Sequence, residues 1–132
     1  FSEIQQGMVL LWGIKRDDTI KDADVLIKKI GNMRVFSDDF GKMNKSIKDI
    51  DGQFLLVSQF TLLGNISKGN RPSFIDAEEP IRAEKILSYI SKELTTYAEV
   101  SEGKFGANMN ISLENDGPVT IVLESENGQL KI

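Results

Sequence analysis

Gln53–Leu63 reads QFLLVSQFTLL and is the stretch that decides the fold of this chain. Apolar residues occupy both faces of this segment, which is typical of a strand buried inside a sheet. The segment Gly7–Ile14 (GMVLLWGI) has the same character and predicts a second buried strand. A sheet is therefore expected at the centre of the protein.

Two amphipathic helices are expected to pack on this sheet. The first covers Asp17–Met33, where Asp18 or Thr19 can cap the N-terminus and apolar residues recur at helical spacing. The second covers about Pro80–Ala98, because proline suits an early helical position and another apolar stripe follows it. A sheet with two main helices is an α+β arrangement, with mixed α/β layers.

Further strands are expected around this framework. An Asp-Gly pair predicts a hairpin that joins Ser46–Ile50 to Gln53–Leu63. Asn108–Glu114 alternates between apolar and polar residues, and Val119–Glu124 follows across a turn, so both are predicted strands.

Composition limits the chemistry that is available. The 132 residues are expected to form one domain, and they include no Cys and no His. A disulfide, a thiol nucleophile, a serine–histidine triad and a metal site built on Cys or His are excluded. The net charge of −4 does not favour nucleic-acid binding, and no apolar run approaches the length of a membrane span.

Two segments place polar groups where the pattern predicts core or strand. Ser58-Gln59-Phe60-Thr61 ends the apolar strand, either because the strand emerges at the sheet edge or because a site lies beyond the strand end. In Asn115–Thr120, Pro118 follows Gly117, which indicates either a tight turn that ends a strand or a specific backbone feature. A cis bond before Pro118 is plausible.

Basic residues gather in two glycine-containing loops, Lys68-Gly69-Asn70-Arg71 and Gly41-Lys42-Met43-Asn44. Such loops are either solvated or able to hold phosphate. Neither loop matches a known nucleotide-binding fingerprint.

Together these segments resemble the D-aminoacyl-tRNA deacylase family, also called D-tyrosyl-tRNA deacylase. They follow the family's order and span nearly all of the chain from Gly7 to Ser125. The matching residues are Asp18-Thr19 with Asp22-Ala23, Gly41-Lys42-Met43-Asn44, Ser58-Gln59-Phe60-Thr61-Leu62, Lys68-Gly69-Asn70-Arg71-Pro72-Ser73-Phe74, Phe105-Gly106-Ala107 with Met109, and Asn115-Asp116-Gly117-Pro118-Val119-Thr120.

The resemblance implies a cytoplasmic hydrolase that cleaves the ester between a D-amino acid and the 3′-terminal adenosine of tRNA, with glycyl-tRNA as a further substrate. It implies a homodimer whose sheets close across the subunit interface, without a cofactor or a catalytic metal, and without DNA or a membrane as partner. The implied residues are Ser58, Gln59, Phe60 and Thr61 for catalysis, Phe105, Met109 and Thr120 for the pocket, and Lys68, Arg71 and Lys42 for tRNA. Gly117 and Pro118 would reach in from the partner subunit and exclude an L side chain, a form of specificity by built-in clash.

Two mechanisms fit these residues. Backbone N–H groups of Phe60 and Thr61 can stabilise an oxyanion while the ribose 2′-hydroxyl assists water. Alternatively Thr61 is the nucleophile, although no His or nearby Lys is available as its base.

Other functions also remain open. The chain could be an inactive tRNA-binding module, or an editing deacylase that acts on small L-aminoacyl-tRNA. Family members begin with one further strand, carrying a Gln-Arg-Val-like stretch, before the segment that opens this chain. We expect residues 1–132 to be a trimmed deacylase domain without that strand.

Overall fold

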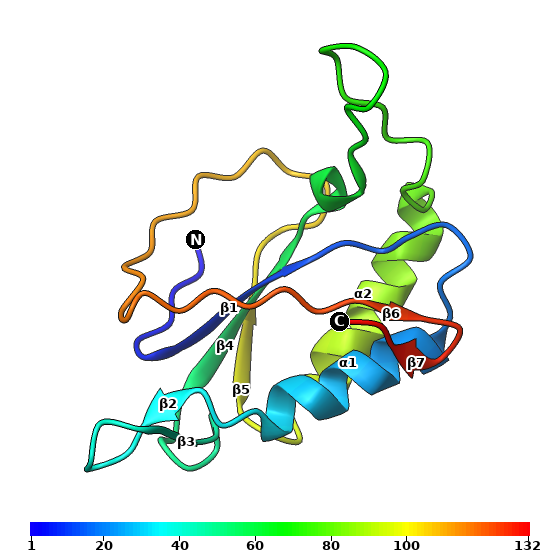
Figure 1. The fold of residues 1–132 in the computed structure, drawn as a ribbon. Helices are drawn as coiled ribbons and strands as arrows, with labels where there is room; N and C mark the ends of the chain where they lie inside the picture. Colours follow the sequence, from blue (N-terminus) through cyan, green and yellow to red (C-terminus); the bar gives the residue numbers. More distant parts are fainter.

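The centre of the fold is a three-stranded parallel sheet, seen in a computed structural model that describes residues 1–132 (Figure 1). Strand β4 (Gln53–Ser58) lies between β1 (Gly7–Trp12) and β5 (Glu99–Glu102). β4 lies between two neighbouring strands, and its inner residues Phe54–Val57 are all apolar. The expected central sheet is confirmed.

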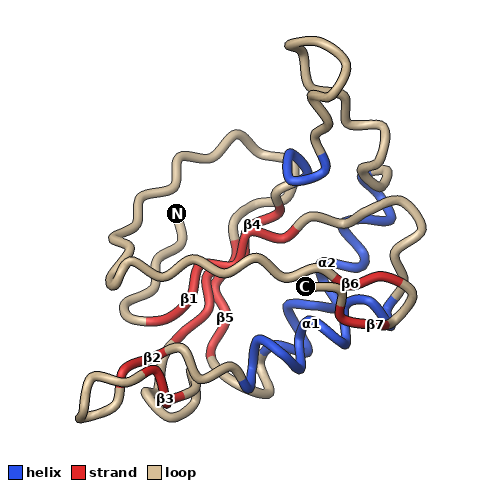
Figure 2. Tube along the Cα trace, viewed as in Figure 1, coloured by secondary structure: helices blue, strands red, loops and turns tan.

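Two helices, α1 (Ile20–Asn32) and α2 (Pro80–Leu94), pack side by side on one face of this sheet (Figures 1 and 2). Phe54 and Leu56 alternate along β4 toward the helices and are almost completely buried. The core cluster consists of Trp12, Ile14, Ala23, Ile27, Ile30, Ile47, Phe54, Leu56, Ala83, Ile86, Leu87, Ile90 and Leu94. The mixed α/β arrangement is confirmed.

Capping residues set the first turn of each helix. Thr19 is the N-cap of α1, and its N–H donates to the Asp22 carboxylate at 2.9 Å. Glu79 caps α2 and accepts from the N–H groups of Arg82 at 2.7 Å and Ile81 at 3.2 Å. Each side chain thereby satisfies N–H groups that have no partner inside the helix.

The predicted hairpin across Asp51-Gly52 is wrong. Ser46 and Asp49 instead exchange side chain to backbone hydrogen bonds, with the Ser46 N–H at 2.9 Å from the Asp49 carboxylate. Such local bonds favour a turn over a strand. Two-stranded ribbons form elsewhere, one from β2 (Phe36–Ser37) with β3 (Met43–Lys45).

The predicted strands Asn108–Glu114 and Val119–Glu124 do not form. Their alternation is that of a half-buried strand, yet no other strand lies alongside them, so their backbone has no ladder to join. The segment 106–122 is instead an extended arm that runs along the outside of the molecule, the yellow-to-orange coil of Figure 1. After the arm, β6 (Ser125–Glu126) and β7 (Gln129–Leu130) form a hairpin on α1.

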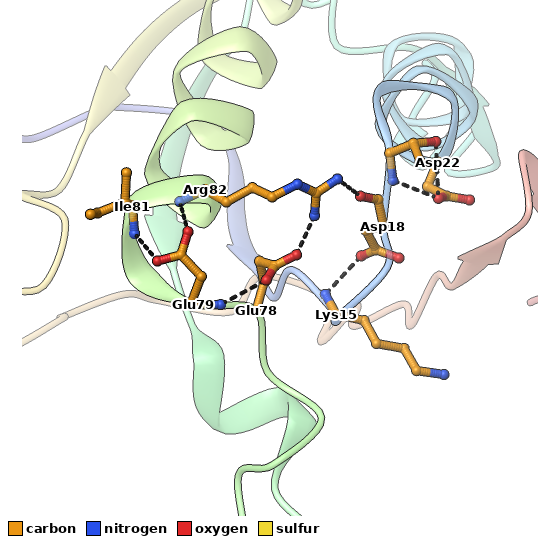
Figure 3. A network of polar contacts seen from close by, with 8 residues as sticks. Lys15, Asp18, Asp22, Glu78, Glu79, Ile81 and Arg82 are labelled. Carbon is orange, nitrogen blue, oxygen red and sulfur yellow. Dashed lines mark hydrogen bonds and ion pairs between the residues drawn. The ribbon is translucent and has the colours of Figure 1, made fainter.

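A polar network joins the starts of α1 and α2 (Figure 3). The Arg82 guanidinium donates to the Glu78 carboxylate and to the backbone carbonyl of Asp18. The Asp18 carboxylate accepts from the Lys15 N–H at 2.7 Å, and burial raises the pKa of this carboxyl. The network therefore fixes the loop that follows β1. Neither helix is long and apolar enough to cross a membrane.

This network is expected to weaken in acid. The N–H of Glu79, assisted by Arg82, holds the pKa of Glu78 below its ordinary value of 4.5. A pKa lowered by folding adds stability above the unfolded-state value, and that stability is lost as the pH falls through the folded-state value. The difference in melting temperature between the protein and a Glu78→Gln variant should therefore shrink from pH 7 toward pH 3. Calorimetry measures it, and a difference independent of pH would contradict the assignment.

Candidate active site

The polar segment Ser58–Thr61 lies at the carboxyl edge of the central sheet. β4 ends at Ser58 beside Trp12, the last residue of β1, and the Gln59 N–H donates to the Trp12 carbonyl at 2.8 Å. Since β1 continues no further, the chain turns into the 3₁₀ helix η1 (Phe60–Leu63). The prediction of one strand to Leu63 is therefore wrong beyond Ser58.

Close packing holds η1 against the loop after β1. A Cβ atom at Gly13 would lie 2.6 Å from Leu63 Cδ2 and 3.2 Å from the Gln59 carbonyl oxygen. A side chain here would press on both groups, so the small size of Gly13 lets the two segments approach closely. On the other side, the ring of Phe60 meets that of Phe74 edge-to-face at 5.1 Å between centroids.

Two backbone N–H groups at the start of η1 are free of hydrogen bonds. The first N–H groups of a helical turn have no partner within it. In η1 these belong to Phe60 and Thr61, and no loop hydrogen bond uses them as donors. Both residues are exposed, with Phe60 at 58%. The arrangement can donate two hydrogen bonds to one oxygen atom of a bound group.

The polar side chains of Ser58–Thr61 differ in their hydrogen bonding. The Gln59 amide donates to the Thr61 hydroxyl oxygen. Ser58 is half-buried, and its hydroxyl is free of protein partners. No side-chain base reaches the Thr61 hydroxyl, because its partner is the neutral amide of Gln59.

Two of the expected pocket residues follow the neighbouring strand at the same edge. β5 pairs with β4 in parallel, and the Gly103 N–H donates to the Leu56 carbonyl at 3.0 Å. Phe105 then packs against the core cluster, and the Met109 sulfur lies 2.6 Å from the Cβ position of Gly103. Carboxyl ends of parallel strands share one edge, so Phe105 and Met109 are brought toward Ser58.

The third expected pocket residue, Thr120, lies in the arm with Gly117 and Pro118. The peptide bond before Pro118 is cis, as the sequence made plausible, and Gly117 has a φ of +134°. Asn115 closes this turn, because it accepts from the Val119 N–H and donates to the Thr120 hydroxyl, both at 2.9 Å. Asn115 has no role of its own in the sequence prediction, although an Asn ahead of a Gly-Pro turn is a signal for such closure.

The turn does not reach the Ser58–Thr61 segment of its own chain. In Figure 1 the arm bends far to the left of the sheet, whereas η1 lies at its upper end. Hydrogen bonds of the arm residues 108–122 are confined to the turn itself. The structure therefore separates the turn 115–120 from the catalytic candidates within one chain.

The basic candidates divide into two groups. Lys68 and Arg71 are exposed on the loop 64–73, which is closed where Asn65 and Ser73 exchange hydrogen bonds at 2.8 and 2.9 Å. This loop projects beyond η1 (Figure 1). Lys42 lies with the β2–β3 ribbon at the opposite end of the molecule, so one patch cannot contain all three. The chain contains no cluster of three or more acidic side chains placed to hold a metal ion.

Comparison with known proteins identifies the family of this chain. The family described as D-Tyr-tRNA(Tyr) deacylase matches residues 1–124. The chain belongs to this family. The D-aminoacyl-tRNA deacylase of Clostridium novyi (strain NT) is 50% identical over 125 residues, which is 94% of this chain and 84% of that protein. That of Staphylococcus aureus (strain bovine RF122 / ET3-1) is 46% identical over 131 residues, 98% of this chain and 87% of that protein.

A solved structure has a similar fold. The protein named c-Myc DNA Unwinding Element Binding Protein aligns with a TM-score of 0.86 and 42% sequence identity. The alignment covers 93% of this chain and 85% of that one. The resemblance of the sequence to the deacylase family is thus confirmed.

Proposed function

We propose that this chain is a hydrolase that cleaves the ester bond of D-aminoacyl-tRNA. Membership of the D-Tyr-tRNA(Tyr) deacylase family supports this substrate class. The observation that carries the chemistry is the pair of free N–H groups of Phe60 and Thr61 at the carboxyl edge of the sheet. Two donors aimed at one oxygen stabilise the negative charge that forms when an ester carbonyl is attacked.

In the proposed reaction, water attacks the ester carbonyl carbon. A new carbon–oxygen bond forms, and the carbonyl oxygen becomes an oxyanion held by the N–H groups of Phe60 and Thr61. The attacking water gives up a proton, the carbonyl re-forms as the bond to the ribose oxygen breaks, and this oxygen takes up that proton as the D-amino acid leaves. The neighbouring 2′-hydroxyl of the ribose is proposed to position the water, since the site contains no imidazole and no thiol. Glycyl-tRNA fits the same scheme.

Thr61→Ala is expected to remain an active deacylase. The Thr61 hydroxyl accepts from the neutral Gln59 amide and has no base to remove its proton, so it is a poor nucleophile. We expect kcat to fall by no more than about tenfold, which is below the 10²–10⁴-fold typical of losing an acid–base group. Single-turnover deacylation measures this, with circular dichroism to verify folding. Abolished turnover in a folded variant would identify Thr61 as the nucleophile.

Chiral selection is proposed to act between two copies of the chain. The Gly117–Pro118 turn is exposed and distant from the Ser58–Thr61 segment of its own chain, so only a second copy could receive it. The face of β1 turned away from the helices supports such pairing, because Leu11 on this face is 46% exposed. In the proposed homodimer, Gly117 and Pro118 face the α-carbon of the substrate and collide with an L side chain.

The 3′ end of tRNA is proposed to lie along the loop that projects beyond η1. Lys68 and Arg71 are exposed there and can contact phosphates without a large basic surface, which agrees with a net charge of −4. Lys42 lies too far away to share this contact and would meet a different part of the tRNA. The proposed location of the reaction is the cytoplasm.

The deciding experiment compares matched D- and L-aminoacyl-tRNA under single-turnover conditions. The proposal expects hydrolysis of the D-ester and of glycyl-tRNA, with the L-ester left intact. Binding of tRNA without hydrolysis would identify an inactive binding module. Hydrolysis of small L-aminoacyl-tRNA would identify an editing enzyme of different selectivity.

A further inference from the structure

The arm that carries Gly117 and Pro118 is tethered only at its two ends. At its first end, Met109 packs against Gly103 beside the end of β5. At its second end, Leu123 packs against the core cluster, and the β6–β7 hairpin follows. Between these points the arm has no hydrogen bond to the rest of the chain. Its direction therefore depends on how firmly the two ends are held.

The second end of the arm is held through one residue with a buried carboxylate, Asp22 in the first turn of α1. Asp22 is only 5% exposed. One carboxylate oxygen accepts from the Thr19 N–H at 2.9 Å, and the other accepts from the Gly128 N–H at 2.8 Å. The Ser125 hydroxyl donates to the Asp22 backbone carbonyl, also at 2.8 Å. Helix start and hairpin thus share a single residue.

The hairpin is shaped to reach this carboxylate. Asn127 and Gly128 have φ values of +53° and +74°, so the turn presents the Gly128 N–H toward α1. A Cβ atom at Gly128 would lie 3.4 Å from Lys21 Cβ, which shows how closely the hairpin approaches the helix. The N–H of Glu124, the residue that leads into the hairpin, donates to the Ile132 carbonyl at 2.7 Å and closes its base.

A two-stranded hairpin is marginally stable by itself, so its position depends on docking. We propose that Asp22 is a positioning residue for chiral selection, because it docks the β6–β7 hairpin and thereby aims the arm that bears Gly117 and Pro118. This inference rests on the proposed role of Gly117 and Pro118 in excluding L-aminoacyl esters. Asp22 itself does not touch the substrate.

Asp22→Asn is the principal test, since the amide can accept only one of the two N–H groups. Ser125→Ala removes the second bond of the tether and leaves the carboxylate and the cap of α1 intact. Asp24→Asn is the matched control, because Asp24 lies on the same helix and accepts from the Tyr89 hydroxyl of α2, away from the hairpin. Pro118→Ala tests the Gly-Pro turn separately.

Two measurements are made on the full chain. Hydrogen–deuterium exchange of residues 124–132 is expected to rise at least tenfold in Asp22→Asn and to rise in Ser125→Ala, but to stay unchanged in Asp24→Asn. The ratio of kcat/KM for D- over L-aminoacyl-tRNA is expected to fall about tenfold or more in the same two variants, since misplacement by about 1 Å can cost 10²-fold. A general loss of stability would lower both rates and leave the ratio unchanged.

Each outcome decides a separate point. Unchanged exchange in Asp22→Asn and Ser125→Ala overturns the tether. Faster exchange with an unchanged ratio also overturns the inference, provided that Pro118→Ala lowers the ratio. If Pro118→Ala leaves the ratio intact, the role of the Gly-Pro turn fails, and the selective role of Asp22 fails with it.

Discussion

Phe60→Pro is expected to lower kcat about 10²–10³-fold, the usual effect of removing one oxyanion donor. Proline has no N–H, so the substitution deletes one of the two free donors at the start of η1. The backbone should accept it, because Phe60 is the first residue of η1, a position where proline is tolerated.

Phe60→Ala is the matched control for this effect. It removes the ring that packs on Phe74 but keeps the N–H group. We expect Phe60→Ala to change KM or stability more than kcat, and the comparison isolates the donor from the ring. Single-turnover rates of the two folded variants measure the difference. Equal kcat values would show that the Phe60 N–H does not stabilise the reacting oxygen.

Gly117→Ala is expected to lower the selectivity for D- over L-aminoacyl-tRNA about 10²-fold, the scale of a 1 Å displacement. Its φ of +134° lies in a region that L-residues rarely adopt. An added Cβ would lie 2.7 Å from Val119 Cγ2 and 3.0 Å from the Val119 nitrogen, so the turn must move. Gly117 and Pro118 are both exposed, so the domain itself should stay folded.

Gly41→Ala provides the control for backbone strain. Gly41 has a φ of +77°, and an added Cβ would meet no atom within 4 Å. Both variants introduce an L-residue at positive φ, but only Gly117→Ala also displaces a neighbour. The kcat/KM values of both enantiomeric substrates are measured for each variant. A similar change of selectivity in Gly41→Ala would mean that the effect does not arise at the Gly-Pro turn.

Some residues of the candidate site could be recognised from the sequence, and others could not. Ser58–Thr61 stood out because polar residues end a strand whose other positions are apolar, a signal contained in the segment itself. Phe105 and Met109 gave no such signal, because the edge they share with Ser58 exists only when β5 pairs with β4. β5 was itself missed, since Val100 is its only apolar residue.

In the arm, too, local features could be predicted from the sequence and long-range features could not. The sequence identified the turn at Gly117 and Pro118, and its closure by Asn115 is local. The alternation in Asn108–Glu114 predicted a strand that does not form, because pairing requires another strand alongside. The separation of this turn from the Ser58–Thr61 segment of its own chain is likewise a matter of tertiary arrangement.

Patterns within single segments were enough to predict the apolar character of β4, the two helices and their starts, and the candidate residues Ser58–Thr61. These features depend on side chains within a few positions of one another, through apolar periodicity and capping. The tertiary structure alone decided that β4 lies between β1 and β5, that it ends beside Trp12, and that Asp22 joins α1 to the β6–β7 hairpin. Those features depend on contacts between distant segments, and local sequence does not specify which segments will meet.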